Sequence, residues 1–179
     1  LDTVGSDGVA ITAALSGASI VIDGRNTDNN GGYEAITLTN VDTTTSGAIT
    51  VTNYANNIVA TDAAALGGAN DDDVTLTTAS SGIVSLGAVS AATLGDVTIS
   101  SAGTITDITG AQDDLAEITA DVFTVSAATA IGTGSAQIDV NATTVSVIST
   151  GDTYLDTVGS DGVAITAALS GASIVIDGR

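Results

Sequence analysis

The chain contains no cysteine, histidine, proline, methionine or tryptophan, and both of its basic residues are arginines. Without cysteine or histidine it cannot form a disulfide, a thiolate nucleophile, a Ser-His-Asp triad or a His-ligated zinc site. Without lysine it cannot form a Schiff base. Only paired carboxylates remain as catalytic candidates, as in glycosidases. The single Phe and three Tyr offer few aromatic side chains to stack on the sugar ring of a glycosidase substrate. We therefore expect no enzymatic activity.

Positive charge is also nearly absent. Asp and Glu together number 21 against two Arg (Arg25 and Arg179), so the formal net charge at pH 7 is −19. Such a surface repels phosphate backbones and anionic lipid headgroups, which argues against nucleic acid as a partner. No apolar run approaches the length that a membrane-spanning helix needs, so we expect no membrane span.

What the chain does contain is Val, Ile, Leu and Ala alternating with Thr and Ser. Branched side chains favour extended backbone, and alternation places one set of residues inside and the other outside. The pattern predicts an all-β protein. The predicted strands are Ala10–Leu15, Ser19–Asp23, Ala35–Val41, Ala48–Tyr54, Asn57–Thr61, Asp73–Thr78, Gly82–Leu86, Asp96–Ser100, Thr104–Ile108, Asp121–Ser126 and Thr143–Ser149. Only the stretch 111–120 has much helix-favouring composition, and because it is short it is expected to be a loop or a single turn.

One long stretch of the chain occurs twice. Leu1–Arg25 and Leu155–Arg179 are identical in every position, which defines a period of 154 residues (155 − 1). Residues 1–154 are therefore one full repeat, and residues 155–179 begin the next identical repeat. Long periods of this kind are typical of extended arrays.

A finer repeat lies inside the long one. Asp-Val-Thr begins at Asp73 and at Asp96, and Asp-Val-Phe begins at Asp121, so the spacings are 23 (96 − 73) and 25 (121 − 96) residues. Coils of about 22 to 26 residues predict a parallel β-helix (a β-solenoid) of roughly six to seven coils per repeat, about 30 Å long. The alternative is a row of Ig-like β-sandwich beads, although these usually carry core aromatics and tight hairpin turns.

Several segments resemble a known group of proteins. Gly95–Gly110, Phe123–Val140 and Thr143–Asp156 are similar in style to repeats of giant bacterial surface proteins, the filamentous-haemagglutinin-like and large repetitive adhesin families. The resemblance implies a secreted, extracellular or cell-surface protein with a parallel β-helix shaft. It rests on short phrases and carries no catalytic motif.

Two acidic stretches are candidate calcium sites. Gly67–Thr75, which includes Asp71, Asp72 and Asp73, is similar to the nonapeptide of calcium-binding β-rolls, with Asn70 in place of its third glycine. In the second stretch, Asn26, Asp28 and Asn30 occupy alternate positions before a glycine. Oxygen ligands suit a hard cation. The competing interpretation is that both stretches are polar turns at coil corners, in which case no cofactor is required.

These observations predict a structural repeat of a long secreted fibre or cell-surface filament without catalysis. The alternative is a calcium-stiffened adhesin shaft. The expected partners are neighbouring repeats of the same fibre, joined head to tail, and fibres associated side by side.

Overall fold

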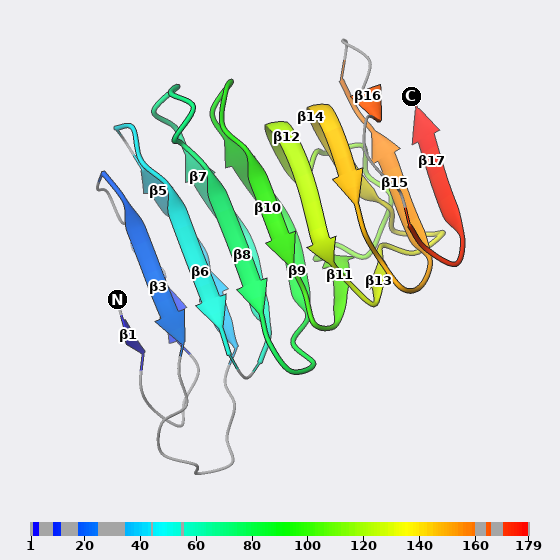
Figure 1. The fold of residues 1–179 in the computed structure, drawn as a ribbon, viewed down its shortest axis with the longest axis horizontal. Helices are drawn as coiled ribbons and strands as arrows, with labels where there is room; N and C mark the ends of the chain where they lie inside the picture. Colours follow the sequence, from blue (N-terminus) through cyan, green and yellow to red (C-terminus); the bar gives the residue numbers. More distant parts are fainter. Residues whose placement is uncertain are drawn as a thin grey trace.

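A computed structural model describes residues 2–3, 9–11, 18–24, 35–43, 45–54, 56–159, 164–165 and 170–178. In this part of the chain 17 strands form one sheet that winds along a single long axis, with the two ends of the chain at opposite ends of the axis (Figure 1). The strands are β1 Asp2–Thr3, β2 Val9–Ile11, β3 Ile20–Gly24, β4 Ile36–Leu38, β5 Val41–Thr43, β6 Ile49–Asn53, β7 Ile58–Ala65, β8 Val74–Thr78, β9 Val84–Ala91, β10 Val97–Ser100, β11 Thr104–Asp107, β12 Ile118–Ala127, β13 Ala130–Ile131, β14 Ile138–Val147, β15 Thr153–Thr157, β16 Ala164–Ile165 and β17 Ile174–Gly178. Within these residues, no helix is long and apolar enough to cross a membrane.

The strands stack in three parallel ladders that run along the axis. The first ladder passes through Ile20, Ile49, Val74, Val97, Phe123, Val145 and Ile165, which are successive register partners over six coils. The second runs from Val9 in β2 to Ile174 in β17, and the third from Val41 in β5 to Gly178 in β17. Pairing of every named strand is parallel, so the chain is a β-solenoid and not a row of antiparallel sandwiches.

Alternation within each strand builds the core. In β8 the residues alternate between buried and half-buried, and Val74 and Leu76 are completely buried. The corresponding residues of the coils before and after, such as Val51 in β6 and Ile99 in β10, are also completely buried. Each coil therefore covers the aliphatic layer of its neighbour, which removes apolar surface from water along the whole axis. Among the described residues, Phe123 is the only aromatic one in this core.

Small polar side chains fill the corner between the first and second ladders. Thr78 Oγ1 donates to the carbonyl of Gly82 at 2.8 Å, and Ser149 Oγ donates to that of Gly151 at 2.9 Å. Asn53 occupies the same corner, where its Nδ2 donates to the carbonyl of Asn57 at 2.9 Å. All three side chains are buried, so these bonds satisfy polar groups that are withdrawn from water.

The two copies of the repeated stretch occupy different places in the ladders. Each copy has the same internal register, since Asp2 pairs with Asp23 and Asp156 pairs with Asp177. However, Ile20 lies in the first ladder, whereas its copy Ile174 lies in the second. One full repeat therefore makes between six and seven coils and not a whole number.

Within the described residues, the predicted strands agree with the structure in place and differ in length, and residues 12–15 of the predicted strand Ala10–Leu15 lie outside the described residues. The four central coils of the first ladder take 25, 23, 26 and 22 residues, within the expected range, while the first and last take 29 and 20. The predicted strand Ala35–Val41 divides into β4 and β5, because Thr39 and Asn40 bend the chain between two ladders. The expected loop at 111–120 ends early, since Ile118 already begins β12.

Candidate functional site

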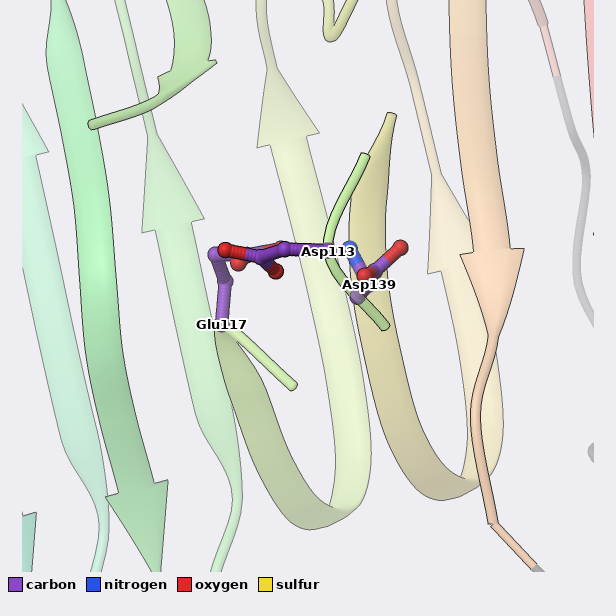
Figure 2. A group of neighbouring side chains, drawn as sticks. All are labelled: Asp113, Glu117 and Asp139. Atoms are coloured by element: carbon purple, nitrogen blue, oxygen red, sulfur yellow. Dashed lines mark hydrogen bonds between the residues drawn. The ribbon is translucent and has the colours of Figure 1, made fainter. Parts of the chain in front are cut away.

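Three carboxylates converge where a long loop folds against the second and third ladders. One carboxylate oxygen from each of Asp113, Glu117 and Asp139 lies within 4.8 Å of the others (Figure 2). Glu117 and Asp139 are buried, whereas Asp113 is exposed. No other group of three or more acidic side chains in the described residues comes together in this way. We refer to these three residues as the carboxylate cluster.

The loop that carries two members of the cluster runs from residue 108 to residue 117, between β11 and β12. Asp107, the last residue of β11, shapes its start. The carboxylate of Asp107 accepts hydrogen bonds from the backbone and hydroxyl of Thr109, at 2.7 and 2.6 Å, and from Ala111 N at 3.2 Å. Gly110 and Asp114 then take positive φ values of 66° and 60°, which turn the chain back toward the ladders.

The parallel register brings acids of successive coils into one column. Glu117 immediately precedes Ile118, which pairs with Val140, so Glu117 lies beside Asp139 on the next coil. Asp139 in turn pairs with Asp156, and Asp156 with Asp177. Coils lie about 4.8 Å apart, so four carboxylates follow one another along the axis. We call Glu117, Asp139, Asp156 and Asp177 the acidic column.

Uncharged hydrogen-bond donors contact the carboxylates of the acidic column. Gln112 Nε2 donates to Asp139 Oδ1 at 2.7 Å and to Asp156 Oδ2 at 3.1 Å, so one amide from the loop ties two coils together. The backbone N–H of Asp139 donates to Glu117 Oε2 at 2.6 Å. These bonds fix the positions of the buried carboxylates, but they supply no positive charge to neutralise them.

Burial therefore shifts the protonation of the cluster. Burial, together with the negative charges of Asp139, Asp107 and Asp113, raises the pKa of Glu117 to about 8, against the lowering effect of the hydrogen bond from Asp139 N. Burial, with Asp156 beside it, also raises the pKa of Asp139, while the bond from Gln112 lowers it. At neutral pH Glu117 is thus mostly protonated, which relieves the repulsion within the column.

The chemistry available to the cluster is that of oxygen ligands. Carboxylate oxygens from three side chains match what a hard divalent cation such as Ca²⁺ prefers. A cation would have to displace the proton of Glu117, so its binding would strengthen as the pH rises.

Asp71, Asp72 and Asp73, which sequence reasoning selected for calcium, have separate roles in the structure. Asp72 is buried, and its carboxylate accepts bonds from Gly47 N and Ala69 N, both at 2.5 Å. Asp73 Oδ1 accepts from Asp96 N on the next coil at 2.9 Å, and Asp71 is exposed. The three do not converge into a cluster of acidic ligands, and a calcium site at this turn stays a prediction.

The recurring Asp-Val segments are explained by the same contacts. Asp73 and Asp96 each precede a strand of the first ladder and each accepts a backbone N–H from the following coil, with Asp96 Oδ1 bonded to Val122 N at 3.2 Å. Burial raises the pKa of Asp96, and Asp73 beside it adds to the effect. These aspartates join successive coils.

The other predicted calcium ligands, Asn26, Asp28 and Asn30, lie outside the described residues.

Position Gly47 shows how tightly the Asp72 turn is built. Its φ is 151°, and a Cβ placed there would lie 1.2 Å from the carbonyl oxygen of Ala18 on the previous coil. Only glycine fits at that distance, and its N–H is the one that Asp72 accepts. Asp72 therefore links the turn at 67–72 to the corner of the coil beneath it.

A groove of about 770 Å³ lies along another side of the solenoid. Its lining extends from Leu66 through Thr93 and Asn141 to Gly178, so it spans several coils. None of its lining residues is acidic, although the chain carries 21 acids. The groove lining is formed by small, polar and aliphatic residues, several of them Thr.

Comparison with known proteins adds no relative: no family model, no curated protein and no solved structure matches this chain.

Proposed function

We propose that the chain is a structural repeat of a long secreted fibre or cell-surface filament, in which the β-solenoid forms the shaft. The observation that carries this proposal is the continuity of the ladders from one repeat into the next. Leu155, the first residue of the second repeat, pairs with Ile138 of the first, and Asp156 pairs with Asp139. The strand β17 then pairs with β15 over five residues. Tandem copies can therefore follow one another without a linker between domains.

The composition supports a shaft exposed to solvent. Outward positions carry Thr, Ser and Asp, and the net charge of −19 favours contact of this surface with water. A secreted or cell-surface location and kinship with repetitive adhesins rest on the resemblance of the sequence segments. Because each repeat makes a non-integral number of coils, a loop such as 108–117 would point in a different direction in each successive copy and follow a spiral around the shaft.

The test is to express chains with two, four and eight tandem copies of the full repeat and to measure their length by electron microscopy. Each repeat should add about 30 Å, because between six and seven coils stack about 4.8 Å apart. Beads on a flexible string, or a length that does not grow in proportion, would refute the shaft. Labelling of intact source cells with an antibody against the repeat would test the location.

A shaft stiffened by calcium is the second candidate, and the carboxylate cluster favours it. Asp113, Glu117 and Asp139 come from two successive coils, so a cation held between them would fasten one coil to the next. The cation would also offset the repulsion along the acidic column. The candidate calcium sites are then this cluster and the two acidic stretches expected from the sequence.

Melting curves with 1 mM Ca²⁺ and with chelator, recorded at pH 8.5 where most of Glu117 is deprotonated, would test the second candidate. The midpoint should rise with Ca²⁺, and the rise should be lost in Asp113→Asn. The matched control is Asp114→Asn, which removes a neighbouring carboxylate outside the cluster and should retain the rise. An equal melting midpoint with and without Ca²⁺ would contradict the calcium-stiffened shaft, but it would not contradict a shaft that needs no calcium.

A further inference from the structure

We propose that the outward face of the first ladder, from β6 to β14, binds the surface of ice. This face, which we call the hydroxyl face, consists of two columns of outward side chains, with one residue from each coil in a column. The first column is Thr50, Thr75, Thr98, Thr124 and Ser146, and the second is Thr52, Thr77 and Ser100. The inference goes beyond the proposed shaft and does not depend on it.

The register of the ladder places these hydroxyl groups in a regular lattice. Thr50 pairs with Thr75 and Thr75 with Thr98, and the pairing continues through Thr124 to Ser146. The second column keeps the same register over the three coils from β6 to β10. Neighbouring strands lie about 4.8 Å apart, and residues two positions apart on one strand lie about 6.6 Å apart. The hydroxyl groups therefore repeat at two fixed spacings, at right angles to each other.

The core beneath the hydroxyl face holds this lattice in place. Val51, Leu76 and Ile99, which separate the two columns, are completely buried. Figure 1 shows β6, β8, β10 and β12 side by side and nearly aligned. The branched side chain of threonine has few rotamers, so little conformational entropy remains to be lost when a partner binds.

The hydroxyl groups of this face are left for an external partner. Within the part of the chain that the structure describes, none of these side chains bonds to another group of the protein. The second ladder differs, because its outward Ser85 and Thr106 bond to each other at 3.1 Å. A partner of the first ladder would thus meet hydroxyl groups that can both donate and accept.

The hydroxyl face is uncharged on a chain whose net charge is −19. The aspartates that precede β8 and β10, Asp73 and Asp96, turn their carboxylates to backbone N–H groups of the following coil. Both columns consist of Thr and Ser alone, so they offer no charge to an ionic surface and no aromatic ring to a sugar. The chemistry that remains is that of ordered water.

Ice matches both the chemistry and the spacing of this lattice. Threonine presents a hydroxyl group that can take the place of a water molecule and a methyl group beside it. The two spacings, about 4.8 and 6.6 Å, are close to the repeats of the oxygen atoms on the prism face of hexagonal ice. Water molecules in ice are already ordered, so holding them costs no further loss of their freedom.

Slow growth of ice in a solution of the full chain tests the proposal. The chain should be enriched in the ice over the remaining liquid, with both amounts measured by mass spectrometry. Thr98→Tyr places a bulky ring at the centre of the first column and should lower the amount in the ice about fivefold or more. The matched control is Thr106→Tyr on the second ladder, where the residue is also half-buried and faces outward, and it should keep the enrichment of the parent chain.

Two further measurements keep the test decisive. Thr75→Tyr, one coil away in the same column, should reproduce the loss and replaces Thr98→Tyr if circular dichroism shows that Thr98→Tyr is not folded. A single ice crystal held just below its melting point should stop growing in the parent chain and in Thr106→Tyr, and it should grow freely in the variants of the hydroxyl face.

Three results would overturn the proposal. One is exclusion of the parent chain from ice, and another is equal enrichment of the parent and the variants of the hydroxyl face. The third is a different partner: retention on crystalline cellulose or chitin without enrichment in ice, or a dimer that Thr98→Tyr dissociates. None of these results would affect the shaft, which the length of tandem copies tests separately.

Discussion

The strands β3 and β17 have the same five residues, Ile-Val-Ile-Asp-Gly, and different surroundings. In β3, which lies between β1 and β6, Ile20 is 7% and Ile22 1% exposed. In β17, which pairs with β15 alone among the described strands, Ile174 and Ile176 are only half-buried and Asp177 is exposed. Val21 and Val175, which point outward, are exposed in both copies, at 55% and 39%.

The difference shows that the neighbouring coil decides how far a residue of this protein is buried. The same alternation of Ile and Val produces the same pleat in both copies, but a pleat becomes core only when another coil covers it. An end strand such as β17 keeps one edge of backbone groups and part of its aliphatic face in contact with solvent. Among the described strands, β17 therefore contributes less to the core than β3 does.

The largest expected effect comes from truncating the same isoleucine in each copy. Ile22→Ala should lower the free energy of unfolding by about 2 to 5 kcal/mol, because it leaves a cavity in a closed core. Ile176→Ala should cost less than about 1 kcal/mol, since that side chain is partly solvated. Urea denaturation of both variants measures the difference. Equal losses would mean that the two ends are covered to the same extent.

The second effect concerns pH and contrasts the buried first residue of the acidic column, Glu117, with its exposed last residue, Asp177. The pKa of Glu117 is raised from 4.5 to about 8, so the folded state retains a proton that the unfolded chain releases. Stability should therefore fall as the pH rises from 5 to 8, by about 1.4 kcal/mol per pH unit at most.

Thermal melting at pH 5, 6, 7 and 8 would measure this slope. Glu117→Gln should flatten it, because the amide oxygen still accepts from Asp139 N but carries no titrating proton. Asp177→Asn, at the exposed end of the column, is the matched control and should keep the slope of the parent chain. If Glu117→Gln left the slope unchanged, the pH dependence of stability would have to come from other acids.

A third comparison sets two adjacent aspartates against each other. Asp72→Asn should destabilise the fold by about 1 to 3 kcal/mol, because it removes the charge and one acceptor from the pair of bonds to Gly47 N and Ala69 N. Asp71→Asn, at an exposed position, should change stability by less than about 0.5 kcal/mol. Denaturation midpoints in urea provide the measurement. If both variants matched the parent, the bonds of Asp72 would not matter for stability.

The smallest effect is expected at the outward valines. Val21→Thr and Val175→Thr should each change the free energy of unfolding by less than about 0.5 kcal/mol, because both side chains are exposed and threonine keeps the branched shape that strands favour. Urea denaturation of the two variants beside the parent chain checks this. A large loss at Val21 alone would indicate that another surface covers β3 in solution.

Most of the fold could be predicted from local pattern, and the candidate site could not. The alternation of Val, Ile and Thr located the strands, and the spacing of Asp73, Asp96 and Asp121 predicted the coil. The carboxylate cluster had no such signal, because Glu117 and Asp139 belong to successive coils and meet only through the register of β12 with β14. Asp72 shows the opposite case, since a turn resembling a calcium motif uses its carboxylate to bind backbone N–H groups.

The sequence alone determined the class of fold, the period of the coil and the long repeat, because these depend on the pleat of the strand and on identity between two stretches. The tertiary structure decided which carboxylates meet and on which ladder each copy lies. Register and corner geometry depend on the total length of every coil, and coils of unequal length turn the second copy by one ladder relative to the first. Identical residues thus acquire different exposure and different partners according to the coil that lies beside them.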